Sequence, residues 1–292
     1  MPAATPDTLI AVDIGNSQIK LGRFDFAAAC EAEARGRPLP IAAPHLPEPT
    51  DTLQLPLDSH YGTFDAARLF AWCDELLIGS AYWVVGSVHA AAADEVRVAL
   101  EALDPDLSRH PMLLLDSDHI PLSISVATPS AVGIDRLAAA LAAERLRDAG
   151  RPVLIVDHGS AITVDLLTAK GEFAGGAILP GTAMGGRALA EQTDALPYEH
   201  PEFGPADIPL VGTDTRAAIR AGLYWGTIGA VRELAHRMAD QLEQPPQIFV
   251  TGGGAGTIVD KLADDQLREL RHVPHLVLAG VALAGRLARR AP

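Results

Sequence analysis

Apolar residues follow two patterns along the chain. Short continuous runs are typical of buried strands, and apolar positions at helical spacing are typical of amphipathic helices. In the first half these patterns predict a β-hairpin, a loop, a helix, a strand, a second helix and a further strand. The expected strands are 9–12, 18–24, 82–88 and 112–115, and the expected helices are 63–77, with Thr63 as N-cap, and 90–103. This alternation is typical of an α/β domain with parallel strands.

The second half repeats the alternation of strands and helices. A hairpin is expected at 153–166 and a strand at 247–250, and helices are expected at 133–148, 184–192 and 216–241. Residues 27–34 are rich in alanine and are interpreted as a short helix, whereas residues 35–56 contain six prolines. Because proline has no backbone donor, residues 35–56 are predicted as an irregular surface loop without a continuous helix or a central strand.

The first predicted hairpin ends its first strand on a carboxylate. Asp13 follows the apolar run, Gly15 and Asn16 form a pair that tolerates positive φ in a tight turn, and Ser17 adds a hydroxyl. The backbone N–H groups of such a turn can bind phosphate oxygens, and Asp13 can bind Mg²⁺ directly or through water. An ordinary hairpin in which Asp13 stabilises the turn explains this stretch alone equally well.

A second stretch repeats this frame. Residues 153–166 contain an apolar strand, Asp157, Gly159, the hydroxyl of Ser160 and then an alternating strand. The shared order of strand, aspartate, glycine and strand predicts a duplicated domain with a nucleotide between the halves. Asp157 is then a candidate metal ligand and Ser160 a candidate phosphate ligand, whereas Asp165 is expected to be solvated at the far end of its strand.

Two helix starts contain the residues of ligand-binding turns. Asp135 and Arg136 follow Gly133 at a helix N-terminus, where the dipole favours an anion, an arginine can bind a carboxylate and an aspartate can accept a hydroxyl proton. Residues 251–256 place glycines between a strand and a helix, so the backbone can approach a base or a phosphate. A helix-start acid beside a surface cation, and a plain β–α turn, are the structural alternatives. The histidines, His158 included, show no pattern of partners and are interpreted as structural.

Composition and charge disfavour several classes of protein. The 292 residues are 48% hydrophobic with a mean hydropathy of +0.16, which indicates a globular chain. The net charge of −14 disfavours nucleic acid as a partner, because a phosphate backbone would be repelled. No signal-peptide pattern is seen, the apolar segment 273–287 is too short for a membrane span, and the two cysteines show no metal spacing. A cytoplasmic protein without a membrane or nucleic-acid partner is therefore expected.

Several short motifs occur in a fixed order along the chain. They are Asp-Ile-Gly-Asn-Ser…Lys at 13–20, Gly-Ile-Asp-Arg at 133–136, Asp-His-Gly-Ser-Ala-Ile-Thr at 157–163, Gly-Gly-Ala-Ile-Leu-Pro-Gly at 175–181, Leu-Pro at 196–197, Gly-Thr-Asp-Thr at 212–215 and Thr-Gly-Gly at 251–253. Together they resemble the type III pantothenate kinase family over nearly the whole chain, from residue 9 to about residue 285. The ordered set is specific, whereas any one motif is not.

The resemblance implies an α/β fold of two duplicated actin-like (ribonuclease H-like) domains with the active site in the cleft between them. Residues 1–128 would form the N-terminal domain and residues 129–292 the C-terminal domain. It further implies a homodimeric, ATP-dependent transferase that phosphorylates pantothenate to 4′-phosphopantothenate, the first step of coenzyme A biosynthesis. The implied cofactors are ATP, Mg²⁺ and a monovalent cation, K⁺ or NH₄⁺.

The resemblance also assigns roles to residues of this sequence. Asp135 is expected to be the general base for the substrate hydroxyl, and Asp157 to bind the monovalent cation. The residues expected to bind pantothenate are Gly133, Ile134, Asp135, Arg136 and Thr215. The residues expected to bind ATP are Asp13, Ile14, Gly15, Asn16, Ser17, Gln18, Ile19, Lys20 and Ser160.

The sequence departs from the family pattern at three positions. Ser17 and Ser160 stand where threonine is usual, and both keep the hydroxyl. Val126 stands where a substrate-contacting tyrosine is expected, so either the register of residues 123–129 differs or pantothenate binding is altered. Two alternatives therefore stay open: a non-catalytic paralogue acting as a transcriptional accessory factor, against which the retained carboxylates argue, and a kinase of another small hydroxy acid.

Overall fold

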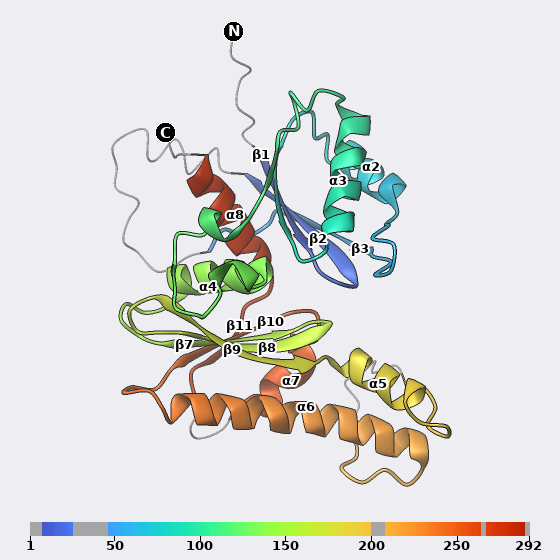
Figure 1. The fold of residues 1–292 in the computed structure, drawn as a ribbon, viewed down its shortest axis with the longest axis vertical. Coiled ribbons are helices and arrows are strands. Elements are labelled where there is room, and N and C mark those ends of the chain that lie inside the picture. Colours follow the sequence, from blue (N-terminus) through green and yellow to red (C-terminus); the bar gives the residue numbers. More distant parts are fainter. Residues whose placement is uncertain (1–7, 26–45, 200–207, 264–266, 290–292) are drawn as a thin grey trace. The chain divides into compact units, whose positions relative to one another are not determined.

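The computed structural model of the chain describes residues 8–25, 46–199, 208–263 and 267–289. These residues fall into two compact units (Figure 1). Unit 1 contains the described residues up to 122, residues 127–146 and those from 275 onwards, and unit 2 contains residues 123–126 and the described residues of 147–274. The helix expected at 27–34 lies outside the described residues, as does the first part of the loop expected at 35–56.

Unit 1 is built on a five-stranded sheet with the spatial order β3-β2-β1-β4-β5. Strand β2 runs antiparallel to both β1 and β3, whereas β4 runs parallel to β1 and β5. The strands are β1 (Thr8–Ile14), β2 (Gln18–Asp25), β3 (Asp51–Pro56), β4 (Tyr82–Ser87) and β5 (Met112–Leu114). The helices are α2 (Ala66–Glu75), α3 (Ala90–Leu103), α4 (Ile134–Leu146) and α8 (Leu276–Ala288), with short 3₁₀ turns at Ser117–His119 and Pro129–Ala131.

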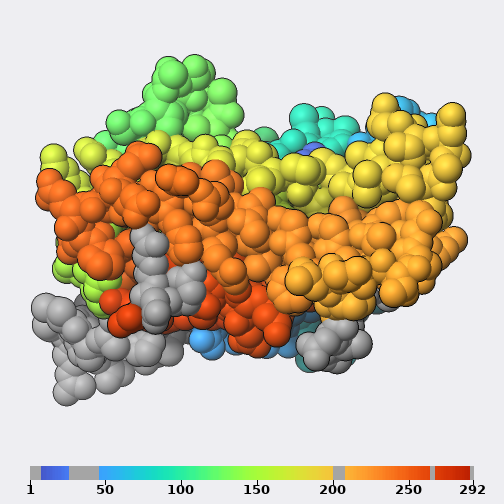
Figure 2. Space-filling view, turned by 90° about the horizontal axis from the view of Figure 1, so that it is seen from below, coloured from blue at the N-terminus to red at the C-terminus, as the bar shows by residue number. Residues whose placement is uncertain are grey.

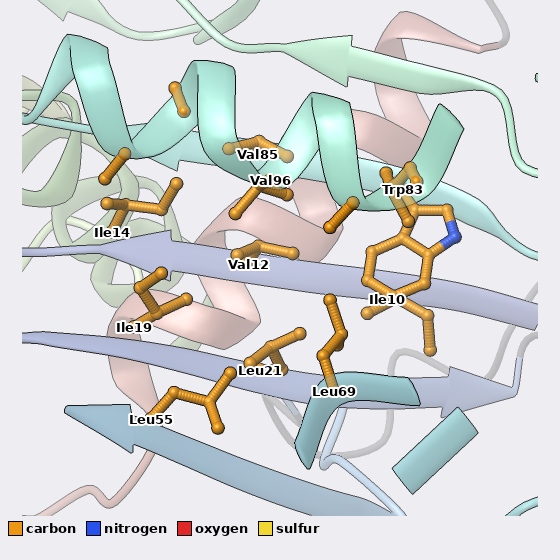
Figure 3. Packing of buried hydrophobic residues seen from close by; sticks show 14 of the residues in the cluster. Ile10, Val12, Ile14, Ile19, Leu21, Leu55, Leu69, Trp83, Val85 and Val96 are labelled. Carbon is orange, nitrogen blue, oxygen red and sulfur yellow. The ribbon is translucent and has the colours of Figure 1, made fainter. Parts of the chain in front are cut away.

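Alternate residues of the central strand face different helices. Ile10, Val12 and Ile14 point from β1 toward α3, where Val96 completes a buried core (Figure 3). On the other face α8 packs on β1 and β4, and α4 packs against α8. That helix pair is very close, because a Cβ at Gly280 of α8 would collide with the backbone of α4. Both faces of the sheet are covered, which explains why β1 reads as a continuous apolar run.

Unit 2 is built on a six-stranded sheet with the spatial order β11-β10-β7-β8-β9-β6. The strands are β6 (Ser123–Ile124), β7 (Val153–His158), β8 (Ala161–Leu167), β9 (Glu172–Pro180), β10 (Gln247–Thr251) and β11 (Leu270–His272). The helices are α5 (Thr182–Glu191), α6 (Thr215–Ala239) and α7 (Ala255–Leu262). Buried residues of α6 and α7 join those of β7, β8 and β10 in one core, and the atoms of α6 run across the face of unit 2 in Figure 2.

The two sheets have the same topology. The order β9-β8-β7-β10-β11 of unit 2 reproduces the order β3-β2-β1-β4-β5 of unit 1. The directions also agree, since the first three strands of each set are antiparallel neighbours and the last three are parallel. This confirms the duplication that the repeated hairpin predicts. The division of the chain at residues 128 and 129 stays a prediction, because the compact units follow spatial contacts and place both α4 and α8 in unit 1.

Two sequence-based predictions about unit 1 are wrong. Residues 51–56 form β3 within the predicted irregular loop, and they do so because an edge strand tolerates Pro56 at its last position while Leu55 is buried. Helix α2 begins after Asp65, not Thr63, because the Asp65 carboxylate accepts hydrogen bonds from two N–H groups of the first turn. In unit 2, β9 and β11 were not expected as strands.

The expectation of a solvated Asp165 is also wrong. Its exposed fraction is 1%, because β8 lies between β7 and β9 and Gly176 of β9 stands opposite. A Cβ at Gly176 would collide with the Asp165 carboxylate.

The structural interpretation of the histidines is confirmed for His89, which caps α3 by accepting from Ala92 N–H at 3.3 Å. None of the helices in the described part of the chain is long and apolar enough to cross a membrane.

Candidate active site

The first hairpin places a carboxylate and an ammonium side by side at the end of β1. Asp13 stands directly opposite Lys20 in the register of β1 and β2, and Lys20 Nζ lies 3.9 Å from Asp13 Oδ2. Asp13 is buried, with an exposed fraction of 7%, and about a quarter of the Lys20 side chain remains exposed, at 27%. The pair therefore has a neutralised carboxylate inside and a cation that still reaches solvent.

The turn of this hairpin differs from the predicted one. The N–H of Gly15 donates to the carbonyl of Gln18 at 3.0 Å, and neither Gly15 nor Asn16 is among the described residues with positive φ. Residues 15–17 therefore close the hairpin without the left-handed conformation. A Cβ at Gly15 would meet the Gln18 carbonyl at 3.5 Å, an ordinary contact. The surrounding fold thus leaves room at Gly15, where a phosphate can approach the backbone.

The start of α4 lies beside this strand end. Gly86 of β4 pairs with Asp13, and Ile134 Cγ2 lies 3.6 Å from the position of a Cβ at Gly86. The next residues continue this contact, because Val88 donates from its N–H to Ile14 and Val88 Cγ1 lies 3.5 Å from the Cβ position of Gly133. Unit 1 therefore brings the predicted phosphate motif and the motif at 133–136 to one edge, at the carboxyl ends of parallel strands, where α/β folds bind ligands.

The backbone fixes the orientation of Asp135. Its Oδ1 accepts a hydrogen bond from Arg136 N–H at 2.8 Å, and the carboxylate is half-buried in the first turn of α4. A Cβ at Gly133 would lie 2.5 Å from the same oxygen, so only glycine leaves room for this arrangement. The glycine at position 133 is therefore needed for the observed orientation of the Asp135 carboxylate.

The second hairpin gathers a different set of groups at the carboxyl ends of β7 and β10. Asp157 pairs with Thr163 of β8 and with Thr251 of β10. The next residue, Gly252, has φ +93°, and a Cβ there would collide with Asp157 Oδ1. Ser160 lies in the β7–β8 turn, and its carbonyl accepts from Gly181 N–H at 3.1 Å. Unit 2 thus brings Asp157, Ser160 and the glycine turn after β10 into contact with one another.

Both hairpins thus present a carboxylate that could bind a cation. Carboxylate oxygens bind hard cations such as Mg²⁺, which usually needs one or two of them and takes its other ligands from phosphates and water. Asp13 meets that need beside a turn with room for a phosphate. Asp157 stands opposite an uncharged residue, Thr163. It is the second candidate carboxylate for a cation.

Thr215 lines an open pocket between α5 and α6. It is the first residue of α6, and the preceding Asp214 caps the helix by accepting from Ala217 N–H at 2.9 Å. The cavity has a volume of about 690 Å³. Its lining is apolar except for Thr215 and consists of Gly185, Leu189, Leu196, Thr215, Ala218, Ile219, Gly222 and Leu223. The placement fits a substrate-contacting threonine.

Glu199 is a candidate residue that the sequence motifs did not reveal. It is 8% exposed and pairs with Arg216 and, at 3.9 Å, with Arg220. Both arginines lie on α6, and Arg216 directly follows Thr215. The spacing of the two arginines by one helical turn was the only available signal, and it does not identify the partner.

Val126 has a defined register, because Ser123 and Ile124 pair with β9, and Val126 Cγ1 lies 3.3 Å from the Cβ position of Gly175.

Comparison with known proteins identifies the family. The family model described as type III pantothenate kinase matches residues 9–237. A relative of that name from Rhodopirellula baltica is 34% identical over 285 residues, which cover 92% of this chain and 95% of the relative. The chain belongs to the type III pantothenate kinase family. Another type III pantothenate kinase, from Anaeromyxobacter sp., is 32% identical over 257 residues, covering 86% of this chain and 89% of the relative. The family predicted from the ordered motifs is thereby confirmed.

Solved structures support the fold. A putative 2-dehydro-3-deoxygalactonokinase protein from Sinorhizobium meliloti matches with a TM-score of 0.55 and 13% identity, covering 97% of this chain and 100% of that one. The ethanolamine utilization protein EutJ from Carboxydothermus hydrogenoformans matches with a TM-score of 0.50 and 18% identity, covering 97% of this chain and 91% of that one. At these identities the likeness concerns the fold alone, and it confirms the predicted α/β fold of the actin-like kind.

Proposed function

We propose that this chain transfers the γ-phosphoryl group of ATP to the hydroxyl of pantothenate, giving 4′-phosphopantothenate in the first step of coenzyme A biosynthesis. The observation that carries this proposal is membership of the type III pantothenate kinase family over most of the chain. The predicted enzyme class, a kinase that uses ATP, follows from the same membership and is confirmed by it.

In unit 1 the hairpin between β1 and β2 is proposed to hold the phosphates of ATP. The turn within the predicted ATP-binding residues 13–20 would approach the phosphate oxygens, Ser17 would add its hydroxyl, and Lys20 would supply a positive charge that is already partly exposed. Asp13 would hold Mg²⁺, which when bound neutralises charge on the phosphates. Phosphoryl transfer relies on positioning and charge stabilisation more than on covalent chemistry, so this set suits the reaction.

The start of α4 is proposed to bind and activate pantothenate. Asp135 would accept the hydroxyl proton, and its fixed orientation, held by Arg136 N–H, supports that role. The Arg136 guanidinium would bind the substrate carboxylate. Gly133 and Ile134 would line the site, and the Thr215 hydroxyl of unit 2 would add a hydrogen bond.

The second hairpin is proposed to bind the monovalent cation and to contact ATP. Asp157 would ligate K⁺ or NH₄⁺, which its uncharged cross-strand neighbour supports. Ser160 would donate its hydroxyl to a phosphate oxygen. We also propose a homodimer, on the basis of the family resemblance, and a cytoplasmic location, on the basis of the cysteine content and the lack of a signal-peptide pattern. The site assignments and the placement of the active site between the two domains remain predictions.

The role of Asp135 is tested with Asp135→Asn in the full-length chain. The amide keeps the size of the side chain and its bond from Arg136 N–H, but it is not a base. We expect ATP binding within about twofold of wild type and a loss of pantothenate-dependent ADP release of about 100-fold or more. Substantial turnover by Asp135→Asn would contradict the assignment.

Val126 motivates one rival function, the phosphorylation of a different small hydroxy acid. The same assay separates the two, because it can be run with pantothenate and with a panel of hydroxy acids. ADP release with another acid but not with pantothenate would favour the rival.

A further inference from the structure

The glycine turn that follows β10 is seated on one side chain of β7. The ring of His158 is 3% exposed and lies under Gly254. A Cβ at Gly254 would be 2.6 Å from His158 Nδ1, 2.7 Å from Cε1 and 2.8 Å from Cγ. Three adjacent ring atoms at nearly equal distance mean that the backbone of Gly254 rests against that edge of the imidazole. The N–H of Gly254 also donates to the His158 carbonyl at 2.9 Å.

The three glycines of the turn face in different directions. Gly252 packs on Asp157 and on the His158 carbonyl, and Gly254 packs on the His158 ring, so neither has room for a side chain. For Gly253, in contrast, a Cβ would meet no atom of the described residues within 4 Å. The flanking glycines are thus required by the fold, and the middle one presents its backbone to open space. A ligand that needs close approach to the backbone can be accommodated there.

His158 has the properties of a packing support. Within the described part of the chain its Nδ1 has no hydrogen-bond partner. The ring occupies the space that a side chain at position 254 would need.

We propose that His158 is a positioning residue for ATP binding. Its ring supports the turn at Gly252–Gly254 and fixes the position of that turn, so that the backbone at Gly253 contacts the nucleotide. The inference rests on the proposed function, since it assumes that ATP is the phosphoryl donor. It adds a role for a residue that touches neither the phosphates nor pantothenate in the assignments above. It also gives a reason for the sequence Gly-Gly-Gly: Gly252 and Gly254 pack against β7, and Gly253 is left to contact the ligand.

A double-mutant cycle tests the seat. Gly254→Ala places a methyl group against the ring, which should lift the turn and raise the KM for ATP about tenfold, with kcat at saturating ATP and the KM for pantothenate nearly unchanged. In a His158→Ala background the methyl group has room, so the same substitution should raise the KM for ATP less than about twofold. This ATP-specific, background-dependent effect is not expected from a residue that only stabilises unit 2.

Gly253→Ala is the matched control within the same turn. Its methyl group would meet no atom of the described residues within 4 Å, the His158 ring included, so its effect on the KM for ATP should be the same with and without His158. Equal costs of Gly254→Ala in the two backgrounds would overturn the proposal. So would a rise in the KM for pantothenate as large as that for ATP.

Two further measurements keep the outcome decisive. If Gly254→Ala does not fold, His158→Ala alone should raise the KM for ATP selectively, and an unchanged KM for ATP would overturn the proposal. Failure of the proposed function is recognised separately, because then the wild-type chain itself would show no pantothenate-dependent ADP release. If the wild-type chain phosphorylates pantothenate but the effects of Gly254→Ala and His158→Ala on the KM for ATP are additive, only the role of His158 is refuted.

Discussion

The two hairpins share one frame but differ in the residue that faces the carboxylate. Asp13 at the end of β1 faces Lys20, and Asp157 at the end of β7 faces Thr163. Directly opposite residues of an antiparallel pair lie on the same side of the sheet and interact. The first carboxylate is therefore balanced by a cation of the protein itself, whereas the second faces a neutral hydroxyl. The two copies of the hairpin thus differ in the charge near their aspartate, and the difference comes from the single residue that faces it across the strands.

The difference matches the division of labour that we propose. A lysine beside a turn with room for phosphate suits the highly charged end of ATP, and the adjacent Asp13 can share Mg²⁺ with it. A carboxylate without a facing lysine suits a bound monovalent cation. The comparison is sharpened by exchanging or removing these groups one at a time.

The largest effect is expected from Asp13→Asn. The change removes the proposed Mg²⁺ ligand and leaves Lys20 without the carboxylate 3.9 Å away. We expect kcat/KM for MgATP to fall about 100- to 1,000-fold, the scale for loss of a charge-stabilising group. Steady-state kinetics over a range of Mg²⁺ concentration measure this. The comparison would fail if activity stayed within a few fold of wild type.

A smaller but more specific effect is expected from Asp157→Asn. The amide keeps the shape and lowers the attraction for a cation. Activity at saturating K⁺ should fall about tenfold, and the K⁺ concentration for half-maximal activity should rise. The control is Asp165→Asn, another buried carboxylate of unit 2, whose K⁺ dependence should match that of wild type. Equal responses of the two variants to K⁺ would argue against a cation site at Asp157.

Thr163→Lys places the lysine of the first hairpin into the second. An ammonium facing Asp157 carries the charge that K⁺ would otherwise supply. We expect the ratio of activities with and without K⁺ to fall to less than about twofold, whatever the absolute rate, because the internal cation competes with the added one. Thr163→Met, of comparable length without charge, should retain the K⁺ response. A full K⁺ response in Thr163→Lys would show that the facing position does not decide the difference between the hairpins.

The smallest effect is expected from Val126→Tyr. Restoring the hydroxyl that the family resemblance leads one to expect should lower the KM for pantothenate about fivefold, the value of one hydrogen bond, and leave the KM for ATP unchanged. Val126→Phe supplies the ring without the hydroxyl and separates packing from hydrogen bonding. If both variants raise the KM for pantothenate, position 126 is not at the substrate.

The sequence predicted the elements that local patterns determine. The strands at Asp13 and Asp157 and the helix at 90–103 were found because apolar runs and helical spacing depend on neighbours in sequence. Edge strand β3 was missed because the prolines before it dominate the local pattern, while its pairing with β2 is a non-local fact. The turn at Gly15 was predicted with the wrong backbone conformation for a similar reason.

The candidate site was predicted where a motif carries its chemistry in its own residues. Contacts between distant segments were not accessible. The seat of Gly254 on His158 joins β7 to the start of α7, and the burial of Asp165 depends on Gly176 in the next strand. Which residues meet in such pairs depends on the order of the strands in the sheet. The motifs indicate that order only by way of the family they resemble.

The most direct test of the central claim is the mass of the product formed from pantothenate by the purified chain with ATP, Mg²⁺ and K⁺. We predict a product heavier than pantothenate by one phosphoryl group, formed in step with ADP and absent when pantothenate or ATP is omitted. Binding of ATP without any phosphorylated pantothenate under these conditions would contradict the account.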